Sequence, residues 1–198
     1  MHLMVADGMY RKGDFDQAIN YLVSFYQKNP ASTKLSVFRQ RILQNITHRI
    51  AQLIEEKNYM EVLAQFTRYS ATWLKNHNRV DVPFFLGRAY ELAGVHAEAE
   101  KIYVQLLAQR KNMKGAEEEK ERKVHEFLPT IDELSLRLAI CELKKKDYSK
   151  AHQYLAQIEN VNSLNTSQRT EWVNSMATVA EETGKNQEAI TYLQQLLV

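Results

Sequence analysis

Residues 86–106 read LGRAYELAGVHAEAEKIYVQL, an apolar pattern of helical period on each side of Gly94. After this glycine, Ala99 is followed by Tyr103 and Leu106, and these spacings of four and seven residues place the three side chains on one face of a helix. A small residue such as Ala99 lets the backbone of a neighbouring helix approach closely. We therefore expect two helices that pack against each other as a hairpin.

The pattern recurs along the chain, as a small residue followed by apolar residues four and seven positions later. A second helical pattern precedes the copies. The small residues are Ala18, Ala99, Ala151 and Ala189, and a weaker copy has Val62 at this place. The sequence therefore predicts repeated helix pairs.

The expected helix starts agree with this division. Three polar residues are followed three positions later by Glu or Gln, which is the spacing of a capping box. These pairs are Asp14 with Gln17, Asn58 with Glu61, and Thr130 with Glu133. Pro and Gly are scarce, at 3 and 6 residues, and no sustained alternation of β-branched residues occurs, so an all-α fold is expected.

The composition is that of a globular protein, with 44% hydrophobic and 25% charged residues among 198. The formal net charge is only +2, from 26 basic and 24 acidic residues, so no strong field attracts the chain to phosphate backbones or anionic lipid. Nucleic acid is therefore not an expected partner. The single cysteine, Cys141, lies in an apolar stretch and is expected to be buried and free.

The sequence contains no run near the roughly 20 apolar residues that a membrane span needs. The first residues, Met1 to Met4, lack the regions of a signal peptide. We expect a cytoplasmic location and no direct insertion into a membrane. The chain opens directly into a helical pattern, so an alternative is a piece of a longer protein whose targeting segment is missing.

No constellation of catalytic or metal-binding type is found in the sequence. The histidines stand singly, and neither an H-E-x-x-H nor a C-x-x-C motif nor a Gly-rich phosphate loop occurs. An enzyme needs such a group of residues in one place. We therefore expect no enzymatic activity, no catalytic residue, no metal and no cofactor.

The helix pair of residues 80–113 resembles the tetratricopeptide repeat (TPR). The positions that carry the resemblance are Leu86, Gly87, Tyr90, Ala99, Tyr103 and Leu106. Pro30 closes the first unit as in the family, whereas Lys111 stands where the third unit would have its proline. The resemblance spans nearly the whole chain and implies an all-α, right-handed superhelical solenoid of about five helix-turn-helix pairs.

We expect a single repeat domain over residues 1–198. Its units are approximately residues 1–34, 38–78, 80–113, 131–165 and 167–198. The longest interval between copies holds a charged insertion, residues 111–131, which ends in Phe127 and Leu128. One interpretation is a solvated helix extension, and the other is a docking arm whose Phe127 and Leu128 anchor a partner or fold back onto the solenoid.

The resemblance also implies a binding site, because the first helices of TPR pairs line a concave face that usually receives the ligand. The positions carried over from the family are Asp7, Tyr10, Arg11, Thr47, Ile54, Asp81, Phe84, Arg88, Glu91, Leu136, Ile140, Lys144, Asn174, Thr178 and Glu181. Family members that hold acidic chaperone tails use Lys and Asn where this chain has Leu3 and Asp7, which argues against that ligand.

The central part of the predicted groove is apolar, with cations on both sides. Its apolar residues are Phe84, Leu136 and Ile140, and the cations are Arg88 and Lys144. Such a groove suits an amphipathic helix or an extended peptide with acidic flanks. An alternative is that the apolar end of the insertion fills the groove from within the same chain.

These features predict a scaffold or adaptor that binds another protein. The first alternative is a structural module of a larger protein that self-associates through its terminal helices, because the last helix is apolar and no polar capping helix follows it. The residues concerned are Leu193, Leu196, Leu197 and Val198. The second alternative is a helical repeat associated with nucleic acid, which the near-neutral charge disfavours.

Overall fold

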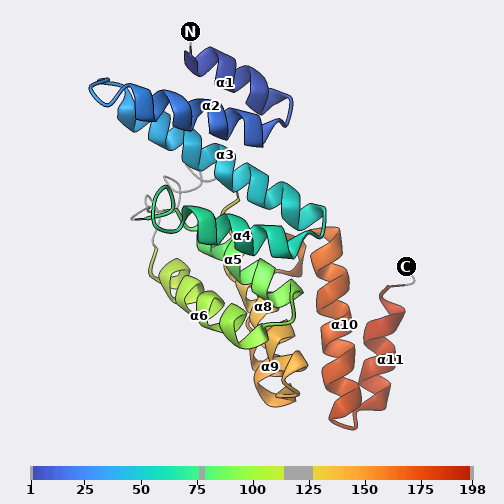
Figure 1. Cartoon of the computed structure of the whole chain (residues 1–198). Coiled ribbons are helices and arrows are strands. Elements are labelled where there is room, and N and C mark those ends of the chain that lie inside the picture. The colour runs from blue at the N-terminus through green and yellow to red at the C-terminus, as the bar shows by residue number, and fades with distance from the viewer. Residues whose placement is uncertain (1, 76–78, 114–126, 197–198) are drawn as a thin grey trace. The chain divides into compact units, whose positions relative to one another are not determined.

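The computed structural model of the chain describes residues 2–75, 79–113 and 127–196 (Figure 1). All regular elements within these ranges are helices, and ten of them are α-helices. The predicted all-α fold is therefore confirmed.

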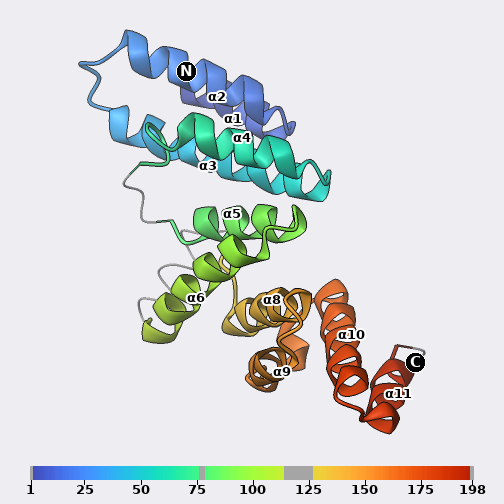
Figure 2. The ribbon, with the colours of Figure 1, turned by 60° about the horizontal axis from the view of Figure 1, so that its bottom comes forward.

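The helices follow one another as five pairs. The first two pairs are α1 (His2–Arg11) with α2 (Phe15–Lys28), and α3 (Leu35–Glu55) with α4 (Tyr59–Tyr69). The other three are α5 (Asp81–Leu92) with α6 (His96–Asn112), α8 (Ile131–Lys144) with α9 (Tyr148–Ala156), and α10 (Thr166–Glu182) with α11 (Asn186–Gln194). A short 3₁₀ turn, Val161–Ser163, precedes the last pair. Figures 1 and 2 both show α10 and α11 side by side, and the two helices pack on each other.

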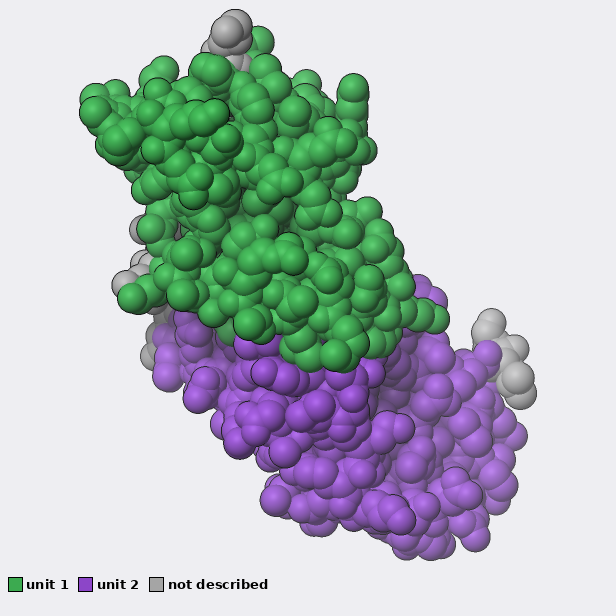
Figure 3. Space-filling view, viewed as in Figure 1, with its two compact units in different colours: residues 1–85 green, residues 86–198 purple. Residues whose placement is uncertain are grey.

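The chain divides into two compact units, residues 1–85 and 86–198 (Figure 3). The division falls inside α5. In the first unit α2 packs on α3, and in the second α6 packs on α8 while α10 packs on both α8 and α9. The single domain over residues 1–198 stays a prediction.

The helices of a pair are joined by a tight turn of one recurring form. Gly94, between α5 and α6, has a φ of 82°, and Lys146, between α8 and α9, has a φ of 63°. The residue after each donates its backbone N–H to the carbonyl five positions back, from Val95 to Tyr90 and from Asp147 to Glu142. This left-handed helix end favours glycine, because a Cβ is strained at positive φ.

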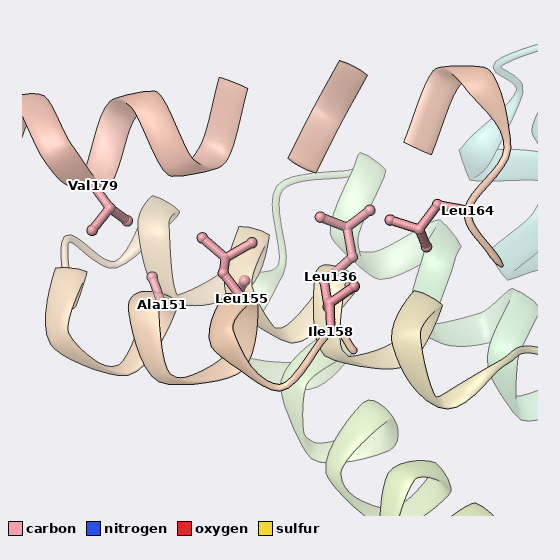
Figure 4. Close-up of a cluster of buried hydrophobic side chains, with 7 residues drawn as sticks. Leu136, Ala151, Leu155, Ile158, Leu164 and Val179 are labelled. Carbon is pink, nitrogen blue, oxygen red and sulfur yellow. The ribbon is translucent and has the colours of Figure 1, made fainter. Parts of the chain in front are cut away.

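The small residues of the repeat lie where helices meet, as the sequence predicts. In α5, a Cβ added to Gly87 would lie 2.6 Å from Cε1 of Tyr103 in α6. In the second unit, the cluster in Figure 4 joins α8, α9 and α10 through buried side chains. Its members are Leu136, Ala139, Ala151, Leu155, Ile158, Leu164 and Val179.

Two of the three predicted helix caps are confirmed. Asn58 accepts a hydrogen bond from the backbone N–H of Glu61, and Thr130 accepts one from that of Glu133. The cap predicted at Asp14 is wrong, because its side chain makes no capping hydrogen bond. The backbone angles of Asp14 and Asn58 are similar, so the difference lies in the side-chain direction, which residue spacing does not determine.

Candidate functional site

The predicted groove residues differ widely in their exposure. The buried ones are Thr47, Asp81, Phe84, Glu91 and Leu136. The half-buried ones are Asp7, Tyr10, Ile54, Arg88 and Ile140. The exposed ones are Arg11, Lys144, Asn174, Thr178 and Glu181. A binding role for the five buried residues stays a prediction, and their burial leaves them out of the candidate site.

Three of the buried residues are held by contacts within their own unit. Leu136 belongs to the apolar cluster of the second unit. Thr47 donates its hydroxyl to the carbonyl of Leu43, one helical turn earlier, at 2.8 Å. Asp81 accepts a hydrogen bond from Nε of Arg79 at 2.9 Å. The residue types do suit a groove, but each side chain is already engaged in packing or hydrogen bonding.

Glu91 is the centre of a buried charge network that links α5, α8 and α10. It accepts hydrogen bonds from Arg88 at 2.6 Å, from Arg137 at 3.3 Å and from the Tyr103 hydroxyl at 2.8 Å. Arg137 also pairs with Glu171 of α10. We call Arg88, Glu91, Arg137 and Glu171 the charged ladder. Its two cations and two anions balance, so the network carries no net charge.

Burial and neighbouring charges shift the pKa of Tyr103 and of Arg137. Burial, followed by the charge of Glu91, raises the pKa of Tyr103 well above its usual value, so the phenol stays neutral. Burial alone would lower the pKa of Arg137, but the charges of Glu91 and Glu171 outweigh it and raise the pKa. Arg137 therefore stays charged, and the ladder acts as a fixed connection between helices.

Three predicted groove residues occupy the same position in three first helices. Arg88, Ile140 and Thr178 each directly follow the small residue of their helix, which is Gly87, Ala139 and Ala177 respectively. Equivalent positions on repeated helices point in equivalent directions. Lys144 lies one turn beyond Ile140 and is exposed. We call Arg88, Ile140, Lys144 and Thr178 the candidate face.

Comparisons with known proteins bear on the repeat and the fold. The tetratricopeptide repeat family model matches residues 84–117. The chain therefore contains a segment that is similar to a tetratricopeptide repeat. Its fold is similar to a crystal structure of nearly identical TPR-like repeats from a Podosopora anserina protein described as a kinesin light chain. That likeness has a TM-score of 0.50 at 19% identity and covers 97% of this chain and 90% of the other. A comparison with curated proteins found no match.

In the first unit, two of the predicted TPR groove residues connect the first pair to the second. The Tyr10 hydroxyl lies 2.7 Å from Nε2 of His48, and Asp7 lies 3.5 Å from Arg41. Arg11 is exposed. These contacts join α1 to α3, so Tyr10 and Asp7 have a structural function whether or not they also meet a ligand.

The predicted docking arm is only partly described. Phe127 and Leu128 are half-buried and come shortly before Thr130, the cap of α8. Of the predicted insertion, residues 114–126, which include its charge run, lie outside the described residues, so both interpretations of the arm stay predictions.

Sequence reasoning did not identify Arg137 as the residue that links α8 to the first helices α5 and α10. The signal was present, because Arg137 is the one charged residue in the apolar run from Leu134 to Ala139. A charge among buried positions needs a partner. The partners themselves are distant in sequence, so the run alone does not name them.

A pocket of about 360 Å³ lies among α9, α10 and α11. Sequence reasoning did not identify this pocket either. Its lining residues include Tyr148 of α9, Val179 of α10 and Tyr192 of α11.

Within the described ranges no group of three or more His, Cys, Asp or Glu side chains could hold a metal ion. In the same ranges, no helix combines the length and the apolar character needed to cross a bilayer.

Proposed function

We propose that the chain is a scaffold or adaptor that binds a peptide or an amphipathic helix of another protein at the candidate face. TPR repeats generally mediate protein-protein interactions, and this chain has their fold. The observation that carries the proposal is the repeated position of Arg88, Ile140 and Thr178 on three first helices, at which Ile140 is half-buried and Thr178 is exposed, while Arg88 also pairs with Glu91.

The chemistry of the candidate face favours one kind of ligand. Ile140 is a half-buried apolar anchor, and Lys144 is exposed next to it on α8. Apolar anchors supply most of the affinity of such surfaces, and charges at the rim set orientation and association rate. An apolar segment with an acidic flank fits this face. A non-enzymatic role belongs to the same proposal.

A crosslinked pull-down from the extract of the source organism tests this proposal. We expect Lys144→Glu to lose a protein that the wild type captures, because the variant repels an acidic flank. Lys28→Glu is the matched control, since it makes the same change at an exposed residue of a second helix, α2. A partner captured equally by the wild type and both variants would show that the candidate face is not the binding site.

Self-association through the terminal helix is the second candidate function. Ile190 and Leu193 lie on α11 and are 49% and 47% exposed. Leu196 lies just after the end of α11 and is 40% exposed. Exposed apolar residues that lie close together on one helix favour association. Light scattering of the wild type and Leu193→Glu tests this function. A wild type that remains monomeric at high concentration would exclude it.

A further inference from the structure

A lysine at the end of α8 holds the carboxyl groups of two helices at once. Nζ of Lys145 lies 2.7 Å from Oε2 of Glu100 in α6 and 2.8 Å from Oε1 of Glu142 in α8. The side chain of Glu142 is 0% exposed, whereas those of Glu100 and Lys145 are 26% and 33% exposed. We call Glu100, Glu142 and Lys145 the carboxyl cluster. It connects α6 to α8, two helices that also pack on each other.

The charges of the carboxyl cluster do not balance when all three groups are ionised. Two carboxylates then share one ammonium, and one of the two, Glu142, is shielded from water. A buried carboxylate without its own counter-charge is costly, and such a group takes up a proton instead. The cluster therefore favours a state with one proton on its carboxyl groups.

The second oxygen of Glu142 indicates where this proton lies. Oε1 already accepts from Lys145, whereas Oε2 is buried and no N–H or O–H group of the described residues donates to it. Glu142 and Glu100 are nevertheless within hydrogen-bonding reach of each other. Two ionised carboxylates only accept hydrogen bonds, but a protonated carboxyl group donates one. A proton on Glu142 thus satisfies the contact with Glu100.

The groups of α8 and α9 around the carboxyl cluster do not supply the missing positive charge. Lys150 of α9 is the next cation, but it is 58% exposed and pairs with Asp147 at 3.2 Å. Burial, followed by the charges of the cluster, raises the pKa of Tyr154, so this phenol stays neutral. Burial also raises the pKa of Cys141 to about 12, so its thiol stays neutral.

The nearby acidic groups of α5 and α10 have partners of their own. Glu91 of α5 and Glu171 of α10 both pair with Arg137 in the charged ladder. Glu182 of α10 is hydrogen-bonded to Tyr148. The titration of the carboxyl cluster is therefore governed by its own three members.

The same contacts shift the two carboxyl groups in opposite directions. Burial is the largest cause for Glu142, and it raises the pKa of this group above its ordinary value of 4.5. The hydrogen bond from Lys145 is the largest cause for Glu100, and it lowers the pKa of that group. The proton therefore belongs to Glu142 and the negative charge to Glu100.

We propose that Glu142 is a proton-dependent clamp between α6 and α8. In the clamped state, protonated Glu142 donates Oε2–H to the Glu100 carboxylate, and Lys145 donates to both side chains. Loss of the proton leaves two anions on one ammonium and weakens the contact between the helices. The clamp concerns the junction between two helix pairs, so it is independent of the function proposed above.

The clamp has a defined dependence on pH. A group whose pKa is raised by folding binds more protons in the folded chain than in the unfolded chain. The contribution of Glu142 is complete below its ordinary value of 4.5 and is lost as the pH rises through the higher pKa of the folded chain. Glu100 has the opposite dependence, and its contribution is lost only as the pH falls below 4.5.

Urea unfolding of the full chain between about pH 5 and about pH 8 tests the clamp. Glu142→Gln is the matched variant, because its amide donates to Glu100 and accepts from Lys145 as the protonated carboxyl group does. We expect the two chains to have the same urea midpoint at the lower pH and the variant to have the higher midpoint at the upper pH. Glu98→Gln, which changes an exposed carboxyl group of the same helix, should follow the wild type.

NMR of the chain with ¹³C-labelled glutamate side chains observes the proton directly. The Glu142 carboxyl resonance, assigned through its own backbone amide, should titrate above 4.5, and this result needs no variant to fold. Titration of Glu142 at or below 4.5 would overturn the proposal. Midpoints of the wild type and Glu142→Gln that change alike with pH would also overturn it.

Discussion

At the scale of single residues, Gly87 determines how closely α5 approaches α6. A Cβ at this position would lie 2.6 Å from the ring of Tyr103, which is fully buried and hydrogen-bonded to Glu91. The ring has little room to move, because close-packed interiors resist added atoms. Gly87 is therefore a packing requirement and not a flexible point in the helix.

We expect Gly87→Ala to destabilise the fold by about 1–3 kcal/mol, although alanine is the better helix former. The matched control is Gly8→Ala, where an added Cβ has no neighbouring atom within 4 Å. The control should gain up to about 1 kcal/mol from helix propensity. Urea unfolding followed by circular dichroism measures both, and a stabilising effect of Gly87→Ala would contradict the close approach.

Arg137 should be the most sensitive charged residue of the second unit. Its side chain is 3% exposed and pairs with both Glu91 and Glu171. We expect Arg137→Met to cost about 3–5 kcal/mol, because it leaves buried carboxylate partly unpaired. Lys101→Met, which removes an exposed ion pair with Glu98, should cost less than about 1 kcal/mol. Equal losses in urea unfolding would show that the ladder contributes no more than a surface pair.

At the scale of helices, the start of α10 is fixed by a complete capping box. Asn165 accepts from the backbone N–H of Gln168, and the Gln168 side chain accepts from the backbone N–H of Asn165. Asn165→Ala should cost about 1 kcal/mol. Asp14→Ala should change stability little, since Asp14 makes no capping bond. Thermal unfolding of the two variants compares them, and a larger loss at Asp14 would restore the cap expected from the sequence.

At the scale of the whole molecule, the near balance of charge limits its partners. A formal net charge of +2 supplies no basic surface of the kind that releases many counterions from nucleic acid. We expect no shift of a duplex DNA band at 0.15 M salt with protein at about 100 µM, a concentration at which basic proteins bind non-specifically. A complex that weakens steeply with added salt would revive the nucleic-acid alternative.

The helices and their pairing could be predicted because the signals are local. A helix forms hydrogen bonds between residues four positions apart, so the spacing of Ala99, Tyr103 and Leu106 already defines the buried face. The caps at Asn58 and Thr130 are equally local and were found, whereas Asp14 shows that spacing does not fix a side-chain direction.

The candidate site depended on contacts between pairs, which spacing does not reveal. The pattern of the first helices placed Glu91, Leu136 and Ile140 alike in a groove. Only the packing of neighbouring pairs buried Glu91 and Leu136 and left Ile140 half-buried beside the apolar cluster.

The sequence by itself determined the helical repeat and the small residues at its contacts, because both follow from short-range periodicity. The tertiary structure alone decided which polar groups meet and which apolar faces stay open. Arg137 pairs with Glu91 and Glu171, which lie in other helices. Leu193 is exposed, whereas Leu155, at the same position of the preceding pair, is buried. These outcomes depend on which helix packs against which, a long-range property that no local pattern encodes.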